Sequence, residues 1–135
     1  MPLDIAQAVC DEAHKLGLRT SAHIESTEGV EVGLKAGVDT IEHGAPLTDE
    51  LLKLFKKNGL GNASSLTCTL SPALPFAVLS PEKTHSTHVQ KVNGRVVYEG
   101  VATATRQALA NGIPVGLGTD SACPFVTHYD MWREV

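Results

Sequence analysis

The sequence predicts an α/β fold in which short parallel strands alternate with helices along its 135 residues. Short apolar runs recur at residues 18–24, 38–43, 60–66 and 113–118, and segments with helical spacing lie before and between them. Glycines or Asn-Gly pairs stand where these helices should end. Because crossovers between parallel strands are right-handed and local, this order favours one parallel sheet of about four strands.

Each predicted helix is bounded by residues that commonly begin or end helices. The helical segments with their caps are residues 3–17, 26–37, 48–59 and about 93–112. On the last of them, one face is expected to hold Tyr98, Val101, Thr105 and Leu109. Residues 68–92 are rich in proline and serine, and we expect a long loop there with a single helical turn. Residues 121–135 are expected to be a loop or the start of another helix.

Composition excludes several classes of protein. Eleven basic against fifteen acidic residues give a formal charge of −4, which argues against a nucleic-acid partner. No stretch approaches the roughly 18 apolar residues of a membrane span, and the N-terminus has no secretory pattern. The three cysteines are odd in number and lack CxxC spacing, so we expect no disulfide framework and a cytoplasmic location.

Three of the apolar runs end in a residue of the kind that binds metal ions: His23, His43 and Asp120. In parallel βα folds ligands bind beyond the carboxyl ends of the strands, so these residues are expected to converge. Imidazoles and a carboxylate suit Zn²⁺ and related ions. A metal held there would lower the pKa of a bound water, and Asp120 could move a proton as acid and base.

The other polar residues near these positions are given structural roles. His14, His85 and His88 are expected to be structural or solvated, since a lone histidine seldom binds a ligand. Glu42 stands next to His43 in a strand, where side chains alternate between faces. If His43 points inward, Glu42 points away, and a supporting ion pair is the expected role of Glu42.

Residues 23–29 (HIESTEG), 36–44 (AGVDTIEHG) and 118–120 (GTD) resemble the amidohydrolase superfamily. The branch with the greatest similarity contains imidazolonepropionases and Xaa-Pro dipeptidase-like enzymes. The resemblance spans residues 1–135 but only part of the family's (β/α)8 TIM barrel. It implies that the chain is a fragment carrying the equivalents of strands five to eight, which end at His23, His43 and, for the eighth, Asp120.

The resemblance also implies an activity. In such enzymes the two histidines bind one metal ion, or one of them contacts the substrate, while the aspartate binds the other metal and acts as acid and base. The expected reaction is hydrolysis of an amide or cyclic amide C–N bond in a small or dipeptide-like substrate. Zinc, as one or two ions in the complete enzyme, is the expected cofactor. His128 would line the mouth of the barrel as a substrate contact.

Two departures from the family pattern limit these implications. The His-x-His pair of the first strand and the lysine of the fourth have no counterpart here, so the isolated chain is expected to show weak or no activity. Half a barrel has two open edges, which predicts a homo-oligomer or pairing with a missing barrel half. The alternatives are a deaminase of the same superfamily, a non-catalytic self-associating fragment, and a metal-free isomerase or aldolase barrel.

Overall fold

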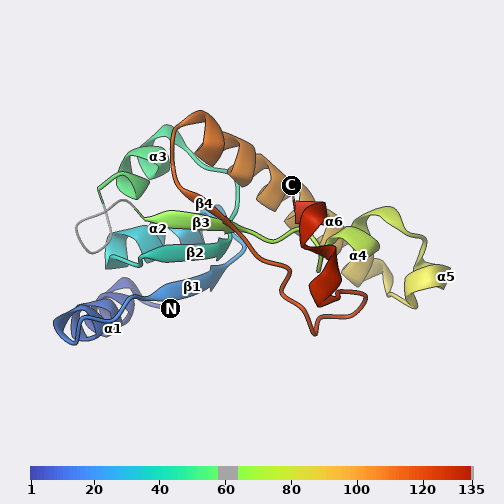
Figure 1. Ribbon diagram of the computed structural model, residues 1–135, viewed down its shortest axis with the longest axis horizontal. Coiled ribbons are helices and arrows are strands. Elements are labelled where there is room, and N and C mark those ends of the chain that lie inside the picture. The colour runs from blue at the N-terminus through green and yellow to red at the C-terminus, as the bar shows by residue number, and fades with distance from the viewer. Residues whose placement is uncertain (58–63, 135) are drawn as a thin grey trace.

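The computed structural model describes residues 1–57 and 64–134 and shows one parallel sheet with helices packed on it (Figure 1). The strands follow one another in chain order, β1-β2-β3-β4, and every neighbouring pair is parallel. They are β1 Ser21–Ile24, β2 Thr40–His43, β3 Ser65–Cys68 and β4 Val115–Leu117. The α/β prediction of about four parallel strands with flanking helices, as in part of a (β/α)8 barrel, is confirmed.

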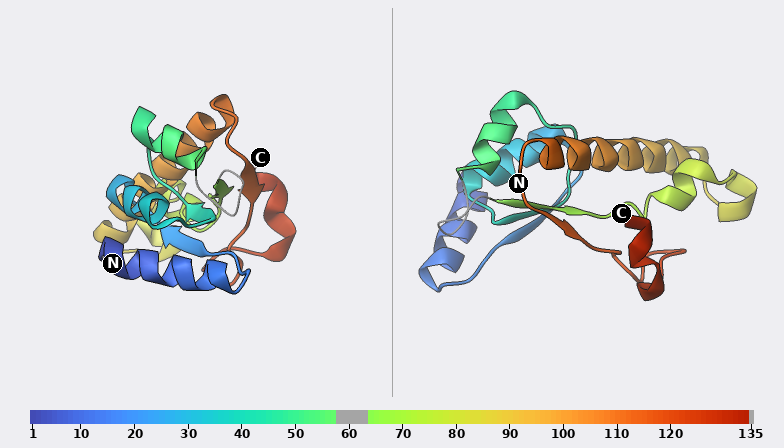
Figure 2. Two further views of the ribbon diagram at one scale, coloured as in Figure 1. Left: turned by 90° about the vertical axis from the view of Figure 1, so that its left-hand side faces the viewer. Right: turned by 45° about the horizontal axis from the view of Figure 1, so that its top comes forward.

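Helices connect the strands and cover one face of the sheet. They are α1 Leu3–Lys15, α2 Thr27–Ala36, α3 Asp49–Phe55, α4 Leu74–Val78, α5 Pro81–Thr84, α6 His88–Ala110 and a 3-10 helix His128–Glu134. The right-hand view of Figure 2 shows α6 running along the sheet and continuing beyond it towards α4 and α5. None of the helices in the described parts of the chain is long and apolar enough to cross a membrane.

The hydrophobic core lies between the sheet and these helices. Leu34 of α2, Phe55 of α3 and Ala104 of α6 pack there with Ile41 and Leu66 from the two central strands, and all five side chains are fully buried. Burying a large apolar side chain contributes about 1.5–3 kcal/mol. Mainly aliphatic contacts, with Phe55 as the one aromatic side chain among these five, therefore hold the central strands in place.

The opposite face of the sheet is polar. The strand register pairs His23 with Glu42 and Glu42 with Thr67, so these side chains share a face, as do Ser21 and Thr40. Ser21 Oγ donates a hydrogen bond to Glu42 Oε1 at 2.6 Å. Glu42 therefore has a hydrogen bond with a hydroxyl group in place of the expected ion pair. The Glu42 side chain lies on the same face of the sheet as His23.

Both edges of the sheet are open within residues 1–57 and 64–134. Only β2 and β3 have strands on both sides, while β1 and β4 each have one neighbour. Apolar side chains lie exposed near both edges, among them Ile5 and Val9 on α1 and Leu117 on β4, which is 47% exposed. Unpaired strand edges of this kind readily accept another strand.

Sequence and structure differ most after the third strand. β3 is Ser65–Cys68, so it ends two residues after the end of the predicted strand at residues 60–66. Residues 60–63 and the predicted helix end at Asn58-Gly59 lie outside the described residues. The expected loop at 68–92 holds two short helices, and α6 begins at His88 instead of residue 93. A capping box explains the early start: Thr87 Oγ1 accepts from the Gln90 amide at 3.2 Å, and Gln90 Oε1 accepts from the Thr87 amide at 2.9 Å.

The other helix ends agree with the sequence. Ser26 caps α2 by accepting from the Gly29 amide, and Thr48 caps α3 by accepting from the Leu51 amide. Gly37 ends α2 in the left-handed conformation, with φ of 91°. The three cysteines are free, as expected.

Candidate metal centre

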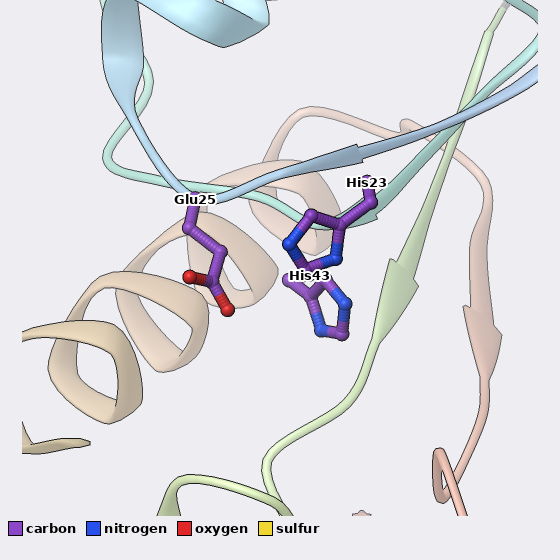
Figure 3. Close-up of side chains that lie close together, drawn as sticks. All are labelled: His23, Glu25 and His43. Carbon is purple, nitrogen blue, oxygen red and sulfur yellow. The ribbon is translucent and has the colours of Figure 1, made fainter. Parts of the chain in front are cut away.

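The two predicted histidines meet at the carboxyl ends of neighbouring strands. His23 lies in β1 and His43 is the last residue of β2. Their ring centroids are 4.7 Å apart and the ring planes are inclined by 79° (Figure 3). Two of the three residues that the sequence predicts to converge therefore lie together at one edge of the sheet.

The backbone at His43 makes this contact possible. Alternation along β2 would place His43 on the same face as Ile41, which packs into the helix-covered core. His23 belongs to the opposite face, with Glu42. His43 takes φ of 68°, outside the extended region of a strand. The strand geometry ends at this residue, and its ring meets that of His23 although the register assigns them to different faces.

Glu25, which the sequence prediction did not include, joins His23 and His43 in a group of three possible metal ligands. One donor atom from each of His23, Glu25 and His43 lies within 4.8 Å of the others. Figure 3 shows the Glu25 carboxylate turned towards the space beside the two rings. A signal was present in the sequence, because Glu25 follows His23 by two residues and residues two apart in an extended chain share a face.

This donor set suits a divalent cation. Two imidazoles and one carboxylate form a three-ligand set typical of catalytic zinc sites, which leave a fourth position open. His43 is buried, with 7% of its surface exposed, whereas His23 and Glu25 are exposed. Of the three ligands in such a centre, His43 would be shielded from solvent, whereas His23 and Glu25 would be accessible to it.

Gly44 holds the two strand ends together. Its amide donates to the Ile24 carbonyl at 2.9 Å, so it extends the β1–β2 ladder beyond His43. Its φ is 86°, and a Cβ there would lie 2.7 Å from Leu66 Cδ1. The close approach to the core fixes the backbone immediately after His43.

Asp120 lies three residues beyond β4, with φ of 51° and an exposed side chain. Its Oδ2 accepts from Cys123 Sγ at 3.5 Å. Burial raises the pKa of the Cys123 thiol, and the Asp120 carboxylate raises it further. The three-donor group found among the described residues does not include Asp120. Its role as ligand and acid/base stays a prediction.

The remaining histidines divide as follows. His128 is exposed, and its Nδ1 hydrogen-bonds to Ser121 Oγ at 2.9 Å; its contact with substrate stays a prediction. His14 has a structural partner, because its Nε2 lies 2.9 Å from Asp39 Oδ2. His85 and His88 are exposed, as expected for solvated histidines.

A buried carboxylate that the sequence did not single out fixes the loop after β3. Glu134 of the 3-10 helix accepts hydrogen bonds from the backbone amides of Leu70 and Ser71 and from the Ser71 hydroxyl. Its side chain is buried. The contact joins the C-terminal 3-10 helix to the segment that leads from β3 into α4, beside the candidate metal centre.

Comparisons with known proteins bear on this arrangement. No protein-family model matches the sequence. A crystal structure of a candidate prolidase from Bifidobacterium longum is similar, with 43% identity and a TM-score of 0.93 over 99% of this chain and 33% of that one. A Xaa-Pro dipeptidase with methionine bound in its active site is 25% identical, with a TM-score of 0.78 over 99% of this chain and 32% of that one.

The similarity to the amidohydrolase superfamily is confirmed. Ochratoxinase from A. niger, at 21% identity and a TM-score of 0.73 over 91% of this chain and 26% of that one, shares the fold. An uncharacterised protein of Mycobacterium tuberculosis is 32% identical over 122 residues, which are 87% of this chain and 30% of that protein. The chain thus spans about a third of the length of the relatives it matches.

Proposed function

We propose that this chain carries part of the active site of a metal-dependent hydrolase that cleaves an amide C–N bond in a dipeptide-like substrate. The observation that carries the proposal is the meeting of His23, Glu25 and His43 at the carboxyl edge of a parallel sheet. The relatives support the reaction class, since one is a Xaa-Pro dipeptidase and another a candidate prolidase. Dipeptides therefore rank above cyclic amides as substrates.

In the proposed site His23 and His43 would hold a divalent ion, with zinc the expected one, and Glu25 would supply a carboxylate ligand. A bound ion would polarise the substrate carbonyl and lower the pKa of a coordinated water. Asp120 takes the proton of the attacking water on its carboxylate and returns it to the leaving nitrogen as the C–N bond breaks. His128, oriented by Ser121, contacts the substrate.

The first experiment is a zinc titration of the purified chain by calorimetry. We expect one ion to bind, and His23→Ala or His43→Ala to weaken binding by roughly 100-fold or more, since even supporting residues around a metal change affinity 10–100-fold. His88→Ala is the matched control, because His88 is an exposed histidine outside the three-donor group. Equal affinity in all four proteins would refute the metal centre.

Activity is tested separately, with Xaa-Pro dipeptides and added zinc. The chain alone is expected to be weakly active or inactive, because its relatives are about three times as long. Where hydrolysis is measurable, Asp120→Asn should abolish it and leave zinc affinity within a few-fold, if the main task of Asp120 is proton transfer. Hydrolysis that survives Asp120→Asn would remove Asp120 from the mechanism.

The proposal extends to how the chain is completed. Residues 1–135 would supply the equivalents of strands five to eight, and the open edges of β1 and β4 would pair with a second copy or with the other half of a barrel. The cytoplasmic location expected from the cysteine pattern belongs to the same proposal. The competing proposal is that the chain is a non-catalytic fragment that self-associates through its open sheet edges. This alternative predicts self-association without zinc binding.

A further inference from the structure

A pocket of about 260 Å³ lies directly beside the metal centre, with Glu25 and His43 in its wall. The rest of the wall comes from the segment between β3 and the first half of α6. Its apolar part consists of Pro72, Ala73, Phe76 and Val97. The right-hand view of Figure 2 shows α4 beside the end of α6 that projects past the sheet.

The contacts between α4 and α6 fix the shape of this pocket. A Cβ at Gly94 would lie 2.4 Å from Phe76 Cβ, so only glycine lets the two helices approach this closely. Lys91 Nζ donates to the Leu79 carbonyl at 2.6 Å and ties the end of α4 to α6. On its other side the Phe76 ring meets Phe125, with centroids 6.0 Å apart and planes inclined by 69°. The pocket is therefore formed before any ligand binds.

The wall chemistry identifies the kind of group that fits. Apart from Glu25 and His43, the lining side chains carry no charge, and the polar ones include the amides of Gln90 and Asn93. A charged side chain would lose its hydration there, and the one carboxylate in the wall, Glu25, is already a ligand of the proposed metal ion. The volume is also slightly below the roughly 300 Å³ at which pockets for whole small ligands begin. It suits one apolar side chain.

We propose that this pocket between α4 and α6 is the subsite that selects an uncharged, apolar side chain on a residue flanking the scissile bond. The inference rests on the proposed hydrolase function and adds the substrate preference. Val97 is the best residue for a test, because it lines the pocket and its neighbour Val96 does not. Val96 lies on the same helix and is 63% exposed, which makes Val96→Phe a matched control for Val97→Phe.

The experiment measures kcat/KM for leucyl-proline against alanyl-proline and for prolyl-leucine against prolyl-alanine, with zinc added. In one of the two pairs the wild-type chain should prefer leucine. Val97→Phe should reduce that preference by roughly tenfold or more, since one methylene in an apolar pocket changes specificity about 10–200-fold. Val96→Phe should leave the preference unchanged. A preference that survives Val97→Phe would overturn the subsite.

The hydrolase proposal fails if the zinc titration shows no binding, whereas no hydrolysis of any of the four dipeptides agrees with the weak or absent activity expected of the isolated chain. The pocket is then tested by NMR on methyl-labelled wild-type chain, titrated with N-acetyl-leucinamide. Saturable shifts at the Ala73 and Val97 methyl groups, absent with the corresponding aspartate amide, would support the subsite. No shifts at these two methyl groups, or equal shifts with both ligands, would overturn it.

Discussion

Gly44→Ala is the substitution whose effect follows most directly from the structure of the site. Gly44 comes immediately after His43 and has φ of 86°. An added Cβ would lie 2.7 Å from Leu66 Cδ1 and 3.5 Å from Ala104 Cβ. The distance to Ala104 is an ordinary van der Waals contact, but the distance to Leu66 is too short, and Leu66 is fully buried, so its side chain cannot move aside into solvent. The substitution therefore meets two separate obstacles, one in the backbone and one in the core.

The expected loss of stability is the sum of these two contributions. A left-handed backbone costs a residue with a Cβ about 1–2 kcal/mol. Forcing extra volume into a packed core costs about 1–3 kcal/mol. The unfolding free energy of Gly44→Ala should then fall by about 2–5 kcal/mol. Gly37→Ala separates the two, because Gly37 has φ of 91° but no atom within 4 Å of the added Cβ.

Urea denaturation followed by circular dichroism measures both variants. Gly37→Ala should lose only the backbone part, about 1–2 kcal/mol. Zinc affinity should fall for Gly44→Ala even in urea-free buffer, since Leu66 can be relieved only by moving the backbone next to His43. Equal destabilisation in the two variants would refute the packing argument. Unchanged zinc affinity in a folded Gly44→Ala chain would refute its link to the metal centre.

Three other predictions concern the rest of the fold. Burial raises the pKa of the Cys68 thiol above its usual 9.0, and the Glu134 carboxylate raises it further while a hydrogen bond with Thr105 lowers it. Stability from the neutral thiol is therefore complete below pH 9 and lost as the pH rises through the higher folded-state pKa, so as the pH rises above 9 wild type should lose more stability than Cys68→Ala. Thr87→Ala removes the capping box of α6 and should cost about 1 kcal/mol, measured by thermal unfolding; no change would mean that the cap adds nothing. Light scattering at micromolar concentration should show dimers or larger species, because both sheet edges are open, and a stable monomer would contradict this.

The sequence predicts the elements of this fold where local signals are strong. Ser26, Thr48 and Gly37 mark helix ends through their own side chains or backbone preference, and all three lie where expected. Thr87 carries the same kind of signal, with Gln90 three residues later, but the surrounding prolines and serines favoured a loop. Leu109 was expected on the same face of α6 as Val101, yet Leu109 is 63% exposed, whereas Val101, Ala104 and Ala108 are buried. Small residues form this face because the helix lies close to the sheet.

The site is harder to predict than the fold, because it depends on departures from regular structure. Strand ends placed His23 and His43 at the same edge, and this part of the prediction needed only the parallel topology. Their contact also needs the left-handed backbone of His43, which periodicity does not encode. Glu25 lies beyond the last residue of β1, so a search for strand ends passed over it.

Left-handed backbone at residues other than glycine is concentrated around the proposed active site. Such residues cost of order 1–3 kcal/mol each and persist only where their surroundings hold them. Within the described residues they are His43, His85, Asp120, Ala122 and Phe125. One ends β2 beside the metal centre, and three lie in the segment after β4 that carries Asp120 and reaches Phe76 through Phe125. At His43 the departure brings a ligand to its partner, and the same reasoning makes residues 120–125 the segment most worth testing for function.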